Sequence, residues 1–212
     1  MKDLPVFTTE HGAATLILKE IPYQETAYII LRDSLEPLAL AKECAGFCRA
    51  CGAQRIYAVG HEALSAYPFY TAMWEMTSLR ENIPDTDAAL WPVQEKTLTQ
   101  WQRIYNEKVK KVPNGAWMTN ADAEKMLQDG DGYFIHRGET LLGIGRASSD
   151  RIDWVASTAP GAGADVVKAL AHAATADRIS LTVASVNQKA VTLYECLGFI
   201  KSAELSKWYQ LR

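Results

Sequence analysis

The chain has 212 residues and a formal net charge of −3; 48% of its residues are hydrophobic and 22% are charged. This length allows one large domain or two small ones, and the weak charge gives no reason to expect nucleic acid or an anionic membrane as a partner. No uncharged apolar run could span a bilayer and the N-terminus has no signal-peptide pattern, so we expect a cytoplasmic location.

The first part of the chain, residues 1–87, shows patterns typical of alternating strands and helices. The residues Asp33 to Glu36 resemble a capping box before a helix, Pro37 fits an early helical position, and Gly52 ends that helix. We expect strands over residues 13–20, 26–32, 55–59 and 72–79, a helix over residues 37–50 and an interrupted helix over residues 63–70.

Three of the four cysteines, Cys44, Cys48 and Cys51, have the helical spacing i, i+4, i+7 and therefore share one stripe of this helix. Three thiols could suggest a metal site, but no flanking loop supplies the turns that zinc and cluster sites use. Free cysteine usually packs as a small hydrophobic residue, so we expect structural cysteines and no metal. The spacing of Cys196 suggests no role.

The segment from Glu81 to Asp87 is acidic, contains a proline and has no hydrophobic periodicity. These features indicate a boundary between two parts, residues 1–87 and residues 88–212. Several polar and aromatic residues precede it, and they either line a substrate pocket shared by the two parts or belong to the hydrophobic core. They are His61, Glu62, Tyr67, Tyr70 and Trp74.

The second part, residues 88–212, again alternates strand and helix patterns. Gly143 and Gly145 point to the same face of a predicted hairpin, where the absence of side chains allows close approach of another segment. We expect strands over residues 88–93 and 151–157, helices over residues 97–109, 121–128 and 164–174, and a hairpin over residues 133–148 with Arg137-Gly138 at its tip.

A glycine loop, Pro160-Gly161-Ala162-Gly163, lies between the last of these strands and the last helix. Such a loop leaves backbone N–H groups free at the positive end of a helix, which suits a phosphate group. Two glycines at this spacing could also begin a dinucleotide-binding fold, but no acidic residue follows at the distance that fold requires.

The stretch from Arg178 to Phe199 has the most specific pattern in the chain. Residues 179–185 alternate as a strand, Asn187 fits a helix N-cap, and Gly198 fits the left-handed residue that ends a helix. Ala190, Leu193, Tyr194 and Leu197 form the apolar face of that helix. The string V-x-x-x-N-x-x-A-x-x-L-Y-E-x-L-G-F resembles, in register along its whole length, the second motif of the GCN5-related N-acetyltransferases (GNAT).

This resemblance covers the whole second part and implies a GNAT acyl-CoA N-acyltransferase fold, an α/β class with a mixed sheet. It implies acetyl-CoA as co-substrate, with a loop of the form Q/R-x-x-G-x-G/A holding the pyrophosphate. The loop pattern carries over to Gly161 and Gly163, and with them to the backbone of Ala162 and Ala164. Either Thr158 stands where the family has Arg or Gln, or the loop is shortened and Pro160 stands there. One lost charge-assisted hydrogen bond costs about 1.5–3 kcal/mol.

The family fold also implies that the strands over residues 152–157 and 179–185 splay apart, so that the pantetheine arm pairs with the first of them. Backbone N–H groups near Val155 and Ala156 would then polarise the thioester carbonyl and stabilise the developing oxyanion.

Tyr194 matches the family position that often supplies the general acid, and a tyrosine with the usual pKa of about 10 is protonated at neutral pH. Without the resemblance, a buried core tyrosine would be the simpler interpretation. Asp153 or an ordered water would serve as the base. Asn187 is most simply a helix cap, although the family often uses this residue near the cofactor, and Lys189 either meets a coenzyme phosphate or is solvated.

The order of strand, helix, strand, Tyr-containing helix and strand occurs in both parts, and Arg55-Ile56 and Arg178-Ile179 begin the matching strands. Residues 1–87 are therefore either a decayed, degenerate half-GNAT repeat or an unrelated small α/β extension. Residues 33–37 occupy the place of the glycine loop, so we expect only one cofactor site.

The expected function is acetyl-CoA-dependent transfer of an acetyl group to a small-molecule or peptide amine. A catalytically inert CoA-binding or interaction module is the alternative, and a nucleotide-binding regulatory domain is a third hypothesis. The sequence contains no readable code for the acceptor amine or for the oligomeric state.

Overall fold

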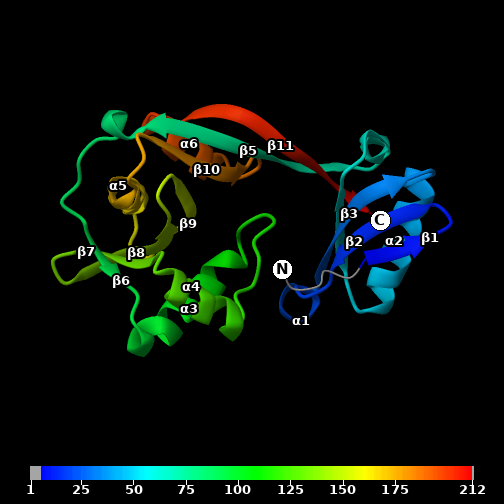
Figure 1. The fold of residues 1–212 in the computed structure, drawn as a ribbon, viewed down its shortest axis with the longest axis horizontal. Helices are drawn as coiled ribbons and strands as arrows, with labels where there is room; N and C mark the ends of the chain where they lie inside the picture. Colours follow the sequence, from blue (N-terminus) through cyan, green and yellow to red (C-terminus); the bar gives the residue numbers. More distant parts are fainter. Residues whose placement is uncertain (1–5, 212) are drawn as a thin grey trace. The chain divides into compact units, whose positions relative to one another are not determined.

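The computed structural model describes residues 6–211, in which strands and helices alternate along the chain (Figure 1). The helices are α1 (Ile21–Gln24), α2 (Pro37–Ala50), α3 (Glu95–Val109), α4 (Asn120–Asp129), α5 (Gly163–Ala173) and α6 (Gln188–Cys196), with 3₁₀ helices η1 (Glu62–Ala66) and η2 (Arg80–Asn82). The strands are β1 (Val6–Thr9), β2 (Gly12–Ile17), β3 (Thr26–Ser34), β4 (Arg55–Val59), β5 (Phe69–Leu79), β6 (Ala89–Pro92), β7 (Gly132–Arg137), β8 (Thr140–Ala147), β9 (Arg151–Ser157), β10 (Arg178–Ala184) and β11 (Ile200–Leu211).

The chain forms two compact units. The first comprises Met1–Met73 and Glu204–Arg212, and the second comprises Trp74–Ala203. The predicted boundary after residue 87 therefore lies within the second unit. The acidic segment belongs to the second unit because Ile83, which is only 3% exposed, packs in the core of that unit. The residues around Ile83 are therefore part of a folded surface and not of a linker.

The first unit contains strands in the order β1-β2-β3-β4-β11. The pairs β1/β2, β2/β3 and β4/β11 are antiparallel, whereas β3/β4 is parallel. Helix α2 connects β3 to β4 and buries Leu40, Cys44 and Cys48 in a core that includes Ile29 and Ile56. Cys51, which was expected on the same buried stripe, caps the helix and is exposed.

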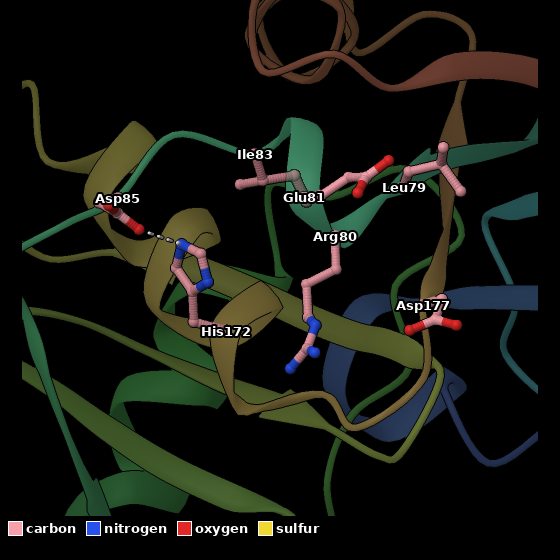
Figure 2. A pocket seen from close by; sticks show the side chains of 7 residues that line it. All are labelled: Leu79, Arg80, Glu81, Ile83, Asp85, His172 and Asp177. Atoms are coloured by element: carbon pink, nitrogen blue, oxygen red, sulfur yellow. Dashed lines mark ion pairs between the residues drawn. The ribbon is translucent and has the colours of Figure 1, made fainter.

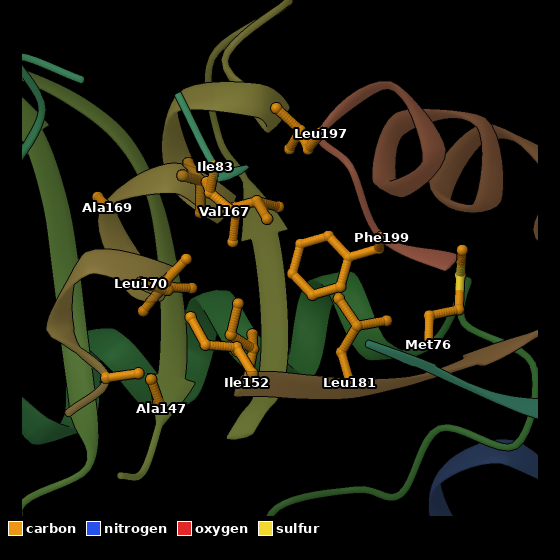
Figure 3. Packing of buried hydrophobic residues seen from close by; sticks show 14 of the residues in the cluster. Met76, Ile83, Ala147, Ile152, Val167, Ala169, Leu170, Leu181, Leu197 and Phe199 are labelled. Atoms are coloured by element: carbon orange, nitrogen blue, oxygen red, sulfur yellow. The ribbon is translucent and has the colours of Figure 1, made fainter. Parts of the chain in front are cut away.

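The second unit contains strands in the order β5-β10-β9-β8-β7-β6, in which β6/β7, β7/β8 and β8/β9 are antiparallel and β9/β10 is parallel. Helix α5 covers one face, where Val167 and Leu170 point toward Ile152 and Leu181 of the sheet (Figure 3). Helices α3 and α4 pack through Trp101, Tyr105 and Met126 in a separate cluster. The two helical layers hold β8 and β9 between them.

The predicted close approach at Gly143 and Gly145 is present, and helix α5 is the segment that approaches. A Cβ atom on Gly145 would lie 2.3 Å from Leu170 Cδ1, and one on Gly143 would lie 2.7 Å from Val166 Cγ2. Neither position can hold a side chain without displacing α5 or the sheet. These glycines therefore fix the distance between α5 and β8.

Most predicted elements agree with the structure within a few residues, but four differ. The segment between the predicted strands over residues 13–20 and 26–32 contains the short helix α1, which was not predicted, and the interrupted helix over residues 63–70 is the 3₁₀ helix η1 followed by β5. Helix α3 begins at Glu95 after Gln94, whose N–H donates to Thr97 Oγ1 at 3.0 Å, instead of beginning at Thr97. The final strand, β11, was not predicted.

Candidate active site

Strands β9 and β10 of the second unit run parallel but are paired only at their beginnings. Their register contains two pairs, Ser180 with Arg151 and Leu181 with Ile152. By comparison, β3 and β4 of the first unit pair along their shared length, from Thr26↔Arg55 to Ile30↔Val59. The predicted splaying is thus present between β9 and β10, and β3 and β4 do not show it.

The backbone direction of β9 decides which N–H groups face the diverging strands. The N–H of Thr158 donates to Leu142 O at 2.8 Å, and donors alternate between the two edges of a strand. The N–H of Ala156 therefore faces β8, whereas those of Val155 and Ser157 face away from it, toward the open edge. Two backbone contacts with the cofactor were predicted on this strand. The N–H of Val155 faces the open edge, where a ligand could accept from it, whereas the N–H of Ala156 points toward β8.

A register shift in the β8/β9 pair makes Asp153 an extra residue on β9, because Arg146 pairs with Trp154 and Ala147 pairs with Ile152. Such a bulge bends its strand and disrupts the local ladder. Here it lies directly after the last β9 residue that pairs with β10. The bulge and the divergence of the two strands therefore begin at the same position.

Several N–H groups of the loop after β9 already donate to carbonyl groups of β8 or of the loop itself. Those of Thr158 and Ala159 both donate to Leu142 O, and that of Ala162 donates to Ala159 O at 3.3 Å. The Thr158 hydroxyl also donates to Leu141 O at 2.8 Å, so this side chain is held against β8. Thr158 consequently does not substitute for the missing Arg or Gln of the family pattern.

The first turn of α5 provides the remaining donors. Within residues 6–211 no acceptor is assigned to the N–H groups of Gly163, Ala164 and Asp165, which begin the helix. Gly161 has φ +77° with open space where a Cβ would lie, and a Cβ on Gly163 would lie 3.2 Å from Leu193 Cδ2 of α6. An anion at this end of α5 would therefore meet backbone donors and the positive end of a helix dipole.

Helix α6 has the predicted capping structure. Asn187 Oδ1 accepts from the N–H of Ala190 at 3.4 Å, and Gly198 has φ +88°. The N–H of Phe199 donates to Tyr194 O at 3.0 Å, and the two rings lie 6.0 Å apart. The Asn187 oxygen is thus already used as a cap. Lys189 is exposed and has no ion pair with another described residue.

Tyr194 packs against the core of the second unit, and burial raises its pKa to about 12. Its hydroxyl has no hydrogen-bond partner among residues 6–211. Tyr194 is only partly buried, and its hydroxyl is not among the buried unpaired polar atoms of the described residues, so the hydroxyl is accessible to a ligand.

Asp153 lies beside two arginines. Its Oδ1 is 3.2 Å from Arg151 Nε, and Arg146 is nearby in an ion pair with Asp131. Burial raises the pKa of Asp153, and the positive charges of Arg146 and Arg151 oppose that rise. The raised pKa fits a proton acceptor better than an ordinary surface aspartate would.

The sequence analysis did not predict a cluster of charged side chains at this end of the sheet. Arg137, at the tip of the β7–β8 hairpin, forms ion pairs with Asp87 and with Asp165 in the first turn of α5. The sequence predicted the hairpin tip, but it contains no signal for which helix the tip would meet.

A cavity of about 490 Å³ lies elsewhere in the second unit (Figure 2). Arg80 crosses it and donates from Nη1 to Ala174 O at 3.2 Å, while His172 Nε2 lies 3.7 Å from Asp85 Oδ1. Because His172 is in the last turn of α5, this cavity is at the opposite end of the helix from Gly163. It is therefore separate from the diverging strands.

The aromatic group of the first part does not line that cavity. Tyr67 packs against the core of the first unit, and Tyr70 stacks on Tyr57 with ring centroids 4.0 Å apart. His61 Nδ1 accepts from the N–H of Ala63 at 3.1 Å and so caps η1. The core interpretation therefore holds for Tyr67, whereas Tyr70 is partly exposed and belongs to none of the hydrophobic clusters of the described residues.

No family model matches the chain, and no curated protein matches it. Several solved structures, however, resemble its fold. A conserved protein of unknown function from Staphylococcus epidermidis has a TM-score of 0.60 at 12% identity, covering 98% of this chain and 93% of its own. A GCN5-related N-acetyltransferase from Sphaerobacter thermophilus has a TM-score of 0.57 at 10% identity, covering 93% of this chain and 75% of its own.

A GCN5-related N-acetyltransferase-like protein from Streptococcus suis has a TM-score of 0.53 at 13% identity, covering 97% of this chain and 88% of its own. The chain thus has the α/β fold of the GCN5-related N-acetyltransferases.

Within residues 6–211, no group of three or more His, Cys, Asp and Glu side chains is arranged to hold a metal ion. In the same residues no helix is long and apolar enough to cross a membrane.

Proposed function

We propose that the protein binds acetyl-CoA between β9 and β10 and transfers its acetyl group to a primary amine. The observation that carries this proposal is the early end of the β9/β10 pairing, next to the first turn of α5. An extended chain could pair with the open edge of β9, and its phosphates would then reach the start of α5. GNAT-fold neighbours with acetyltransferase names support the reaction class.

In this proposal the pyrophosphate accepts hydrogen bonds from the N–H groups of Gly163 and Ala164, and Gly161 allows it to approach the backbone. Ala162, whose N–H is used within the loop, contributes shape only. The N–H of Val155 lies on the open edge, where it would donate to the thioester carbonyl oxygen and stabilise the oxyanion.

The chemistry requires one proton to leave the amine and another to reach the sulfur. The amine nitrogen attacks the thioester carbonyl carbon, the C–S bond breaks, and the products are an acetylated amine and the free thiol. Tyr194 would protonate the departing thiolate, because its raised pKa keeps the hydroxyl protonated at neutral pH. Asp153, or a water beside it, would accept the proton of the amine.

A CoA-binding module without turnover is the second candidate, and the loop gives a specific reason for it. Pro160 has no N–H, and those of Thr158, Ala159 and Ala162 are already used. Fewer donors than the family pattern provides would weaken cofactor binding, and a weakly binding site could serve sensing.

Turnover separates the two candidates. The full chain is incubated with acetyl-CoA and a panel of amines that includes polyamines, amino sugars and peptide N-termini, and acetylated products are identified by mass spectrometry. Mass detection is preferable to a thiol reagent because Cys51 and Cys196 are exposed and would react. We expect at least one acetylated amine. Cofactor binding without any product would leave the inert module, and the absence of both would refute both candidates.

A further inference from the structure

Three charged side chains meet at the end of the sheet that leads into α5: one from β7, one from the loop before β6 and one from α5. Arg137 Nη2 lies 3.0 Å from Asp165 Oδ2 and 2.7 Å from Asp87 Oδ1, and its Nε donates to Asp87 Oδ1 at 2.8 Å. Thr86 Oγ1 lies 3.5 Å from Asp165 Oδ1. Asp165 is therefore held from two sides.

Strand pairing fixes this meeting point. Gly143 pairs with Ser157 at the end of β9, so the hairpin tip that precedes β8 lies beside the loop that enters α5. Ala89 pairs with His136, which brings Asp87 alongside Arg137. The position of the guanidinium next to α5 thus follows from the register of the sheet.

The carboxylate of Asp165 creates a conflict at the proposed cofactor site. A negative charge in the first turn stabilises an empty helix, because it faces the positive end of the dipole. The same charge repels a pyrophosphate bound at that end. A positive partner for Asp165 removes this repulsion while leaving the N–H donors in place.

We propose that Arg137 is a positioning residue for acetyl-CoA: by pairing with Asp165 it neutralises that carboxylate, and so raises the affinity of the start of α5 for the pyrophosphate. This inference rests on the proposed function. Arg137, at the hairpin tip, would thus supply a positive charge near the loop, where Thr158 is uncharged.

A purely structural role is the competing explanation. The Arg137 side chain is 45% exposed, and exposed ion pairs usually contribute little to stability. In that case removal of Arg137 would alter the melting temperature slightly and leave cofactor binding unchanged.

The test is a double-mutant cycle on acetyl-CoA affinity, measured by calorimetric titration of the full chain at low salt. Arg137→Ala should raise the Kd by roughly three- to tenfold, since it removes the positive charge shared by Asp87 and Asp165 and leaves both carboxylates uncompensated near the phosphates. Asp165→Asn should bind at least as tightly as the wild type. The double variant should return to within about twofold of the wild type, because removing Arg137 and the charge of Asp165 together restores the wild-type net charge of the cluster, with Asp87 still present.

Two controls accompany the cycle. Arg137→Lys keeps the charge and should keep the affinity. Lys125→Ala breaks an exposed pair with Asp129, 2.6 Å apart in α4, and should leave the affinity unchanged. The Arg137→Ala effect should also shrink at 1 M salt, where the screening length falls to about 3 Å.

Wild-type affinity in Arg137→Ala would overturn the inference, and so would a double variant as weak as Arg137→Ala, because Arg137 would then act without Asp165. A wild type that does not bind acetyl-CoA would instead refute the proposed function, and this inference with it. If Arg137→Ala does not fold, Arg137→Gln takes its place in the cycle.

Discussion

Tyr194 is the residue whose chemistry is easiest to isolate. Replacement by Phe keeps the ring beside Phe199 and removes a hydroxyl that has no partner within the described residues. If the hydroxyl protonates the thiolate, kcat with an active amine should fall by about 10²–10⁴-fold. Acetyl-CoA affinity and the melting temperature should change little, because no hydrogen bond is lost. Equal kcat values in the two proteins would make Tyr194 a core residue only.

The raised pKa of Tyr194 also has a consequence for stability. Folding favours the neutral form, because burial raises the pKa from 10 to about 12. The contribution to the free energy of unfolding is therefore complete below pH 10 and is lost as the pH rises from about 10 to about 12. Between pH 9 and pH 11 the wild type should lose more thermal stability than Tyr194→Phe. Identical losses would show that burial does not shift this group.

At the residue scale, the sequence was informative where a motif and a backbone conformation coincide. Asn187 and Gly198 were predicted from their caps, and the structure confirms both conformations. Roles that depend on neighbours distant in sequence were less accessible. The direction of the Ala156 N–H depends on the register of β8, and the partner of Asp165 depends on the hairpin tip.

At the element scale, strong periodicity with caps located α2, α5 and α6 within about a residue. Pattern alone failed where tertiary pairing decides the conformation. The residues after Pro68 join β5, and β11 has exposed residues along much of its length and hence no clear alternation. Such a strand is stabilised by its partners and not by its own hydrophobic face.

Helix α2 offers a test through its cysteines. Burial raises the pKa of Cys44 to about 11 and that of Cys48 to about 12, whereas Cys51 and Cys196 are exposed. The thiolate is the reactive form, so iodoacetamide at pH 8 should modify two cysteines in the native protein and four after denaturation. Peptide mass spectrometry identifies them. Native labelling of Cys44 or Cys48 at the rate of Cys196 would contradict the buried stripe.

At the scale of the whole molecule, the two halves of the chain share an order of elements. Two series of elements match: β1, β2, β3, α2, β4, η1, β5 and β7, β8, β9, α5, β10, α6, β11. In both series the first, second and third strands pair antiparallel in turn, and the fourth strand, β4 or β10, is parallel to the third. We infer that residues 1–87 contain the decayed repeat. Its β3 and β4 remain paired along their shared length, which supports a single cofactor site.

The final strand of each unit comes from the other half of the chain. The end of β11 pairs with β4 in the first unit, and β5 adjoins β10 in the second. A chain that ends after Ala203 should therefore lose amide-exchange protection in Arg55–Val59 while α5 keeps its protection. Leu211→Ala, at a residue that is 5% exposed, is a milder variant with the same expected direction. Unchanged protection in β4 would contradict this pairing.

The most direct test of the central claim is acetyl-CoA binding by matched glycine variants. Gly161 and Gly130 have φ +77° and +69°, and neither has an atom within 4 Å of the position of a Cβ. Valine should therefore strain both backbones similarly, but only Gly161 lies in the loop before α5.

In calorimetric titrations we predict that the wild type and Gly130→Val bind acetyl-CoA alike, and that Gly161→Val binds at least about tenfold more weakly. Equal binding by both variants, or none by the wild type, would contradict a cofactor site between β9 and β10.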